Sequence, residues 1–308
     1  MRAVEQNPPT GRPTAAPVAT PLLELLPGVL VKLECNNPGG SHKVRAARHI
    51  VQRALDRGEI VPGVTTVIEK TGGNFGFGLA VACRDIGVPV ELAVGLGFSP
   101  VKRRCLEMFG ARLIGIPMLE AGATPREVVE WHLARGKELG RQYHYTDQFN
   151  NPASLAAHEF ETGPEIAGQL AARDEVTSLT FVSCAGTGAC LSGVARALRT
   201  AGYDVEVVLV EPAGCDSRNG VFVDHRLEGA SVGVAPPMVD WSMVSHAAPV
   251  SAEEMAATQR EFAARTGYFV GNSSAACLHV AQSLSHRATK THKILAIIYD
   301  HGLWYFKH

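Results

Sequence analysis

The protein has 308 residues, enough for about two domains of ordinary size. Its 29 basic and 30 acidic residues are mixed along the chain and leave a formal net charge of −1. This balance excludes the basic surface of a typical nucleic-acid-binding protein and the polybasic face of a membrane-binding one. No apolar run approaches the roughly 20 residues that span a bilayer, and residues 1–20 lack a signal-peptide core. We expect a soluble, cytoplasmic protein without nucleic-acid or membrane partners.

The seven cysteines are scattered along the chain and form no CxxC pair. An odd number at such spacing is typical of reduced, mostly buried thiols rather than of disulfides or a zinc site. We therefore expect no bound metal.

Short β-branched segments alternate with segments of helical periodicity. The predicted strands are Val64–Ile68, Val88–Val94, Arg112–Ile116, Ser178–Ser183, Val205–Val210 and Ile294–Tyr299. The predicted helices are Lys43–Leu55, Phe75–Ile86, Pro125–Leu139, Pro152–Leu170, Leu191–Thr200, Ala252–Arg265 and Ala275–Ser285. Apolar strands that alternate with helices indicate parallel sheets covered on both faces, the α/β class. The polar stretch Gly140–Asn151 separates two strand-helix series, so we predict two domains, each with a mostly parallel sheet covered by helices.

The first predicted helix begins with a lysine. In NNPGGSHKVRAARHI, residues 36–50, turn residues precede Lys43, and Lys43, Ala47, Ile50 and Ala54 follow one another at helical spacing. The amine therefore starts the stripe that should face the core. A lysine at this position can still extend into solvent. If it is buried, its pKa falls, and a neutral amine can form an imine with an aldehyde.

Three junctions between a strand and the next helix are unusual, and ligands on parallel sheets bind beyond the carboxyl ends of strands. The first junction, EKTGGNFGFGLA at residues 69–80, places Thr71, two glycines and Asn74 ahead of a helix. Glycine allows a ligand to approach the backbone closely, and a helix N-terminus offers free N–H groups. A tight turn needs glycine in any case, so this junction alone is a weak signal.

The second junction, SCAGTGACLSG at residues 183–193, favours an anion. Backbone amides and the helix dipole stabilise negative charge there by up to about 2 kcal/mol. The junction lacks the Gly-Lys-Ser/Thr of a Walker loop. A dinucleotide site is the competing interpretation, because Glu211 ends the next strand where a ribose-binding acid is expected. Leu191, however, replaces the third glycine of that motif, so a phosphate group is the preferred ligand.

The third junction, VGNSSAACL at residues 270–278, places Ser273 and Ser274 just ahead of an apolar helix. A simple N-cap is the alternative interpretation of these serines. A phosphate-binding turn, an asparagine loop and a lysine at the start of an apolar stripe together suggest pyridoxal phosphate held as a Schiff base on Lys43.

The motif Asn37-Pro38-Gly39-Gly40-Ser41-His42-Lys43 resembles the cofactor-lysine motif of the fold-type II pyridoxal-phosphate enzymes. That family has the tryptophan synthase β-like fold, and the motif resembles in particular that of O-acetylserine sulfhydrylase (cysteine synthase) and cystathionine β-synthase. The resemblance runs almost from end to end. It includes Thr20-Pro21-Leu22, Ser99, Arg103, Arg104, Gly110, Ala111, Gln148-Phe149-Asn150-Asn151-Pro152, His158, Glu165-Ile166, Val210-Glu211-Pro212 and Asp300-His301-Gly302.

This resemblance implies a role for individual residues. Lys43 would hold the cofactor as an imine and later move the α-proton of the substrate. Asn74 would donate a hydrogen bond to the phenolic oxygen of the cofactor, and Ser273, rather than Ser274, would face its pyridine nitrogen. The cofactor phosphate would bind the loop of Gly186, Thr187, Gly188, Ala189 and Cys190. The substrate would bind at Thr71, Gly72, Gly73, Asn74, Phe75 and Gln148.

Two loops depart from the family pattern. Residues 71–75 read Thr-Gly-Gly-Asn-Phe where the family has Thr-Ser-Gly-Asn-Thr, and residues 188–190 read Gly-Ala-Cys where it usually has Gly-Gly-Thr. The family's aspartate after the lysine is Val44 here. The first loop would therefore have a differently shaped carboxylate pocket, with a ring at Phe75.

We expect a transferase that performs β-replacement on an O-activated L-serine or cysteine-like donor, through an aminoacrylate, with a small nucleophile that need not be sulfide. A neutral hydroxyl at Ser273 makes the cofactor a weaker electron sink than an aspartate would, which favours elimination of a β substituent over transamination. One alternative is a β-elimination lyase or dehydratase, or a racemase, acting on a serine, threonine or cysteine-like amino acid. Another is a binding protein that has lost turnover.

The resemblance also implies a domain organisation. Residues 1–40 would form an N-terminal arm and strands that join the large domain, residues 41–145 a small mobile domain with Lys43 and the asparagine loop, and residues 146–308 the large domain with the phosphate loop and Ser273. The expected assembly is a homodimer.

Overall fold

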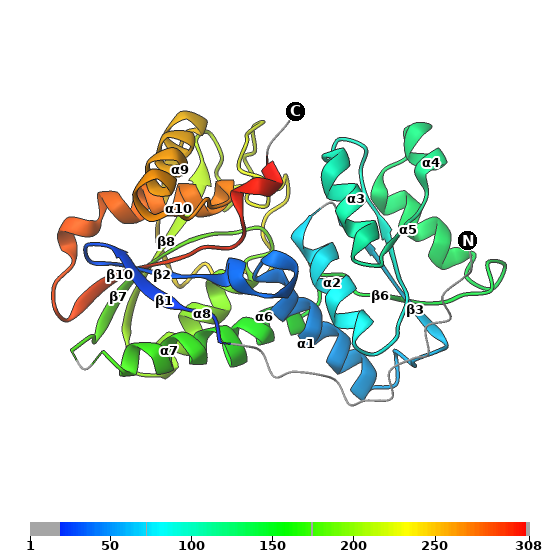
Figure 1. Ribbon diagram of the computed structural model, residues 1–308, viewed down its shortest axis with the longest axis horizontal. Helices are drawn as coiled ribbons and strands as arrows, with labels where there is room; N and C mark the ends of the chain where they lie inside the picture. The colour runs from blue at the N-terminus through cyan, green and yellow to red at the C-terminus, as the bar shows by residue number, and fades with distance from the viewer. Residues whose placement is uncertain (1–18, 72, 174, 306–308) are drawn as a thin grey trace.

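The computed structural model describes residues 19–71, 73–173 and 175–305, which form two lobes side by side, each with its own sheet (Figure 1). The larger lobe has a six-stranded sheet in the order β1-β2-β10-β7-β8-β9, and the smaller lobe a four-stranded sheet in the order β5-β4-β3-β6. The strands are β1 (Leu22–Leu26), β2 (Val29–Lys32), β3 (Thr65–Lys70), β4 (Val90–Ala93), β5 (Arg112–Leu113), β6 (Gln142–Tyr145), β7 (Ser178–Cys184), β8 (Asp204–Pro212), β9 (Val244–Val250) and β10 (His292–Ile297).

Strand pairing is parallel in both sheets, apart from the antiparallel pair β1–β2. The helices that connect and cover the strands are α1 (Lys43–Asp56), α2 (Asn74–Arg84), α3 (Pro100–Met108), α4 (Ile116–Glu120), α5 (Pro125–Ala134), α6 (Ala153–Ala157), α7 (Gly163–Ala171), α8 (Ala189–Thr200), α9 (Ala252–Thr266) and α10 (Asn272–Ser283). The predicted α/β class with two mostly parallel sheets is confirmed.

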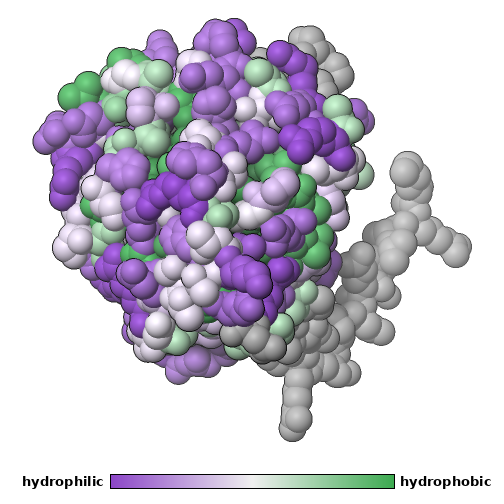
Figure 2. Space-filling model, turned by 90° about the vertical axis from the view of Figure 1, so that its left-hand side faces the viewer, coloured by the Kyte–Doolittle hydropathy of each residue, from purple (hydrophilic) through white to green (hydrophobic). Residues whose placement is uncertain are grey.

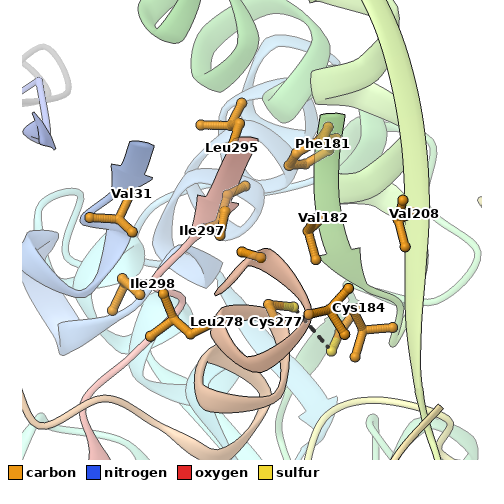
Figure 3. Close-up of a cluster of buried hydrophobic side chains, with 14 of the residues drawn as sticks. Val31, Phe181, Val182, Cys184, Val208, Cys277, Leu278, Leu295, Ile297 and Ile298 are labelled. Carbon is orange, nitrogen blue, oxygen red and sulfur yellow. Dashed lines mark hydrogen bonds between the residues drawn. The ribbon is translucent and has the colours of Figure 1, made fainter. Parts of the chain in front are cut away.

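The core of the larger lobe explains why its central strands are apolar along their whole length. Helices α9 and α10 lie on one face of the sheet and α7 and α8 on the other (Figure 1), so both faces of β7, β8 and β10 are shielded from water. Figure 3 shows Phe181 of β7 and Leu295 of β10 on one side of the sheet and Leu278 of α10 on the other, and all three belong to one buried cluster. Each such side chain stabilises the fold by roughly 1.5–3 kcal/mol when it is fully buried.

The core of the smaller lobe is built around α1 and α2. Ile50 of α1, Leu79 of α2 and Leu92 of β4 are completely or almost completely buried in one cluster. Ala153 and Ala157 of α6 also belong to this cluster. Helix α1 therefore lies between the two lobes, with Lys43 at its first turn.

Several predicted elements differ from the observed ones. The polar stretch predicted as the crossing between domains contains β6, whose residues are half-buried or exposed. Strand β9 was not predicted, because this edge strand is mostly exposed and its sequence, VSHAAPV, has no continuous β-branched run. The predicted strand Arg112–Ile116 covers only two residues, because Ile116 starts α4 with a proline in its first turn. The predicted helix Pro152–Leu170 is interrupted by a π-helical turn at His158–Thr162.

The strands β1 and β2 belong to the six-stranded sheet, and β6 is the last strand in the chain to join the four-stranded sheet. The domain limits at residues 40 and 145 stay a prediction. On the left-hand side of the molecule the surface is mostly hydrophilic, with separate small hydrophobic patches (Figure 2). Among the residues described, no helix combines the length and apolar character needed to cross a membrane.

Candidate active site

A cavity of about 520 Å³ lies between the two lobes and is lined by residues of both. Ligand sites of proteins are typically clefts of this size. The predicted site residues that line it are Lys43, Thr71, Gly73, Asn74, Phe75, Gln148, Gly186, Thr187, Gly188, Cys190 and Ser273. Gly72 lies outside the described residues. The three junctions of the sequence thus meet at one cavity. The third was predicted to follow a strand, but it follows helix α9, with only an isolated bridge at Val270 before α10.

Lys43 presents its amine to this cavity from the first residue of α1. Within the described ranges, its Nζ atom has no hydrogen bond and no ion pair. Burial lowers the pKa of the Lys43 amine, because the charged form loses water without gaining a partner. Burial and the charge of Lys43 hold the pKa of the adjacent His42 well below its usual range. The amine is therefore suited to bond covalently to a carbonyl.

The turn at residues 186–190 leads into α8, a helix of 12 residues. Gly188 has a φ of +86°, and a Cβ atom there would lie 2.5 Å from the backbone nitrogen of Val239. The Thr187 hydroxyl accepts a hydrogen bond from the Ala189 N–H (3.2 Å). Ala189 is buried and, unlike its neighbours, is not among the residues that line the cavity. The turn offers an anion a helix N-terminus with a close backbone approach.

Ser273 and Ser274 have different environments. Helix α10 begins after Gly271, which is its N-cap, so neither serine caps the helix. Ser273 lines the cavity, whereas Ser274 is completely buried and its hydroxyl accepts a hydrogen bond from the Tyr299 N–H (2.9 Å). The preference for Ser273 over Ser274 therefore agrees with the geometry, and the N-cap interpretation is wrong.

The asparagine loop reaches the cavity from the smaller lobe. Asn74 is the first residue of α2, and its Nδ2 donates a hydrogen bond to Asp300 Oδ2 (2.6 Å). The side chain of Phe75 is 2% exposed and belongs to the core cluster of the smaller lobe. The ring thus packs mainly against the core. Thr71 of this loop and Gln148 also line the cavity.

Glu211 does not line this cavity. Its carboxylate accepts a hydrogen bond from the Ser217 N–H (2.8 Å), and it faces a separate, smaller cavity of about 300 Å³ beside β9. A ribose-binding acid would have to share the cavity of the phosphate loop. The dinucleotide interpretation therefore has no support.

A buried network of charges holds the start of α1 against the larger lobe. Arg45 contacts Glu34 through two hydrogen bonds (2.7 and 2.8 Å) and Glu165 through a third (2.8 Å). Lys32 forms an ion pair with the same Glu165, and Thr20 Oγ1 donates to Glu34 (2.7 Å). Thr20 and Glu165, far apart in the sequence, thus support the segment that carries the site lysine.

The outer wall of the cavity contains charged residues that local motifs did not predict. Lys102 of α3 is 3% exposed and pairs with Glu228 of the larger lobe (3.0 Å). Tyr305 also lines the wall. No sequence signal joins these three residues, because each reaches the cavity from a different segment.

The site can accommodate pyridoxal phosphate. The unpaired amine of Lys43 suits its aldehyde, the turn at residues 186–190 suits its phosphate, and Ser273 and Asn74 supply polar groups between them. The fold and the cavity together define a two-lobed α/β protein with a site for a phosphorylated aldehyde cofactor.

Comparison with known proteins identifies the family. Residues 14–300 match the family described as "Pyridoxal-phosphate dependent enzyme". The chain is 31% identical over 277 residues to a cysteine synthase of Staphylococcus aureus, with 89% of this chain and 86% of the relative covered. It is 30% identical over 288 residues to the O-acetylserine dependent cystathionine beta-synthase of Bacillus subtilis, with 91% of each covered. A crystal structure of O-ureido-L-serine synthase superimposes with a TM-score of 0.81 at 28% identity, covering 94% of this chain and 91% of the other.

The protein belongs to the pyridoxal-phosphate dependent enzymes of fold type II, in the group of O-acetylserine sulfhydrylase, and pyridoxal 5'-phosphate is its cofactor. The predicted family and cofactor are confirmed.

Proposed function

We propose that this enzyme performs β-replacement on an O-activated L-serine or cysteine-like amino acid, with a small nucleophile as second substrate. The observation that carries the proposal is the unpaired, desolvated amine of Lys43 in the cavity that also contains the turn at residues 186–190 and Ser273. The relatives named above, a cysteine synthase and two enzymes named for O-acetylserine and O-ureido-L-serine, support the same reaction class.

The predicted site residues each have a role in this proposal. Pyridoxal phosphate, when bound, withdraws electrons from the bonds of the substrate's α-carbon. Lys43 would hold the cofactor and, once released from it, would accept the α-proton on Nζ. The backbone amides at residues 186–190 and the hydroxyl of Thr187 would hold the phosphate. Asn74 would donate a hydrogen bond to the phenolic oxygen of the cofactor.

The remaining roles concern the pyridine nitrogen and the substrate. The hydroxyl of Ser273 would face the pyridine nitrogen and, being neutral, would not hold a proton there, which disfavours transamination. Thr71, Gly73 and Gln148 would bind the substrate carboxylate. Because Phe75 packs in the core, the carboxylate site depends on the backbone of the loop more than on side chains.

Reduction with borohydride and replacement of the lysine test the assignment of Lys43. Mass spectrometry of the reduced wild-type enzyme should find the cofactor attached to the peptide that contains Lys43. Lys43→Ala should remove the visible absorbance of the bound cofactor and lower turnover by orders of magnitude. Turnover at the wild-type rate in this variant would refute the assignment.

A substrate screen distinguishes replacement from elimination. O-acetyl-L-serine, O-phospho-L-serine, serine, threonine and cysteine are each incubated with sulfide, an alkyl thiol, an amine or no nucleophile, and the products are identified by mass spectrometry. We expect amino-acid products that contain the nucleophile. Keto-acid formation at a rate independent of the nucleophile would instead identify a lyase, and a change in the chirality of recovered serine a racemase.

We also propose a homodimer in the cytoplasm, with residues 41–145 closing over the substrate to exclude water. The chain mass is 32.8 kDa. Light scattering of the purified protein should therefore give about twice that mass. A monomer at all concentrations would contradict the proposed assembly.

A further inference from the structure

The side-chain amide of Asn74 is anchored by a buried carboxylate. Asp300 is completely buried, and its Oδ2 accepts hydrogen bonds from Asn74 Nδ2 (2.6 Å) and from the Tyr305 hydroxyl. Burial raises the pKa of Asp300, but both donors reach Oδ2, and a carboxyl oxygen that carries no proton can only accept hydrogen bonds. It therefore binds the nitrogen end of the amide, since the reversed amide would place two acceptors against each other. The nitrogen carries a second hydrogen, and Asn74 lines the cavity.

The two partners come from different lobes. Asn74 starts α2 in the smaller lobe, and Asp300 follows β10 in the larger lobe. The backbone of Asp300 is fixed on two sides, by a bridge to Ser41 and by a hydrogen bond from the Gly271 N–H (3.0 Å). A Cβ atom at Gly271 would lie 1.9 Å from Asp300 Oδ1, so only glycine leaves room for this carboxylate. The acceptor is thus held rigidly.

Tyr305 completes the anchor. Its hydroxyl points at the same oxygen of Asp300, and its ring is covered by the ammonium of Lys102, 4.1 Å from the ring centroid. Lys102 is itself paired with Glu228 at the mouth of the cavity. A cation above the ring stabilises Tyr305 in this position. The hydroxyl can therefore share the carboxylate with Asn74 in a defined geometry.

We propose that Asp300 is a positioning residue that, together with Tyr305, orients the Asn74 amide so that its nitrogen faces the cofactor. The inference rests on the proposed function for the role of Asn74 toward the cofactor. It goes further, because it assigns part of the affinity of the site for pyridoxal phosphate to a hydrogen bond between two residues that lie 226 positions apart in the sequence.

A double-mutant cycle on cofactor binding tests this role. The dissociation constant of pyridoxal phosphate is measured by titration of the apoprotein for the wild type, Asp300→Asn, Asn74→Ala and the double variant. Asp300→Asn keeps the shape but replaces a charged acceptor with an amide that binds either end of Asn74. We expect it to weaken binding about fivefold. Because Asp300 acts through Asn74, the double variant should bind within about twofold of Asn74→Ala.

A matched control separates positioning from general loss of stability. Glu91 is also a buried carboxylate that accepts from a tyrosine, Tyr143 (2.7 Å), but it does not line the cavity. Glu91→Gln should leave the dissociation constant within about twofold of the wild type. If Asp300→Asn does not fold, Tyr305→Phe replaces it in the cycle, with Tyr143→Phe as its control.

The outcomes are distinct. Wild-type affinity in Asp300→Asn, or a fivefold loss that persists when Asn74 is already alanine, overturns the positioning role. Failure of the wild type to perform β-replacement while it still binds pyridoxal phosphate overturns the proposed reaction and leaves this inference standing. Failure of the wild type to bind the cofactor at all refutes both.

Discussion

The replacement of Arg45 by methionine tests how the site lysine is held in place. Arg45 and Glu34 are both completely buried and share two hydrogen bonds, and Arg45 makes a third to Glu165. With Lys32, these residues form a cluster of two positive and two negative charges. Arg45→Met leaves Glu34 buried without its partner, and breaking a buried pair from one side costs about 3–5 kcal/mol. We expect a loss of this size in the free energy of unfolding.

Urea denaturation of the apoprotein at pH 7 measures the loss, provided that the slope with urea concentration is unchanged. Arg57→Met is the control, because Arg57 is 65% exposed and lies 3.9 Å from Glu59. An exposed pair of this kind contributes less than about 1 kcal/mol. Adding Glu34→Met to Arg45→Met removes the unpaired charge, so the double variant should lose less than the sum of the two single losses. A cost for Arg45→Met as small as that of the control would refute the reasoning.

Two further predictions concern the acid at the end of β3 and the phosphate turn. Burial raises the pKa of Glu69 from 4.5 to about 7. Between these two pH values the folded protein therefore holds a proton that the unfolded chain has lost. Its contribution to the free energy of unfolding should therefore fall as pH rises, by about 2–3 kcal/mol between pH 5 and 8. Glu69→Gln should abolish that part of the slope in urea denaturation at the two pH values, and an identical slope would contradict the assignment. Gly188→Ala should cost at least about 2 kcal/mol and weaken binding of pyridoxal phosphate, because φ is positive and Val239 blocks the new methyl group. Gly202→Ala, with φ +93° and open space around it, is the control and should leave cofactor binding unchanged.

The sequence alone determined the class of fold and most of the residues at the cavity. Buried parallel strands such as β7 and β10 are apolar throughout, so their pattern is visible in the chain. The site lysine and Ser273 lie at strand-to-helix junctions or helix starts, where turn residues mark them locally. The parallel arrangement then brings such junctions together at one edge of each sheet. These parts of the site were predictable because each depends on a short segment.

The tertiary structure decided everything that depends on two distant segments. Edge strands β6 and β9 are half-buried or exposed along most of their length, so neither has the continuous apolar β-branched pattern of a buried strand, and their sequences do not distinguish them from loops. The ring of Phe75 turned out to pack in the core, which no local pattern indicates. The contact of Asn74 with Asp300 joins residues from different lobes. A sequence pattern records how much of a side chain is buried, whereas the identity of its partner depends on how the lobes pack together.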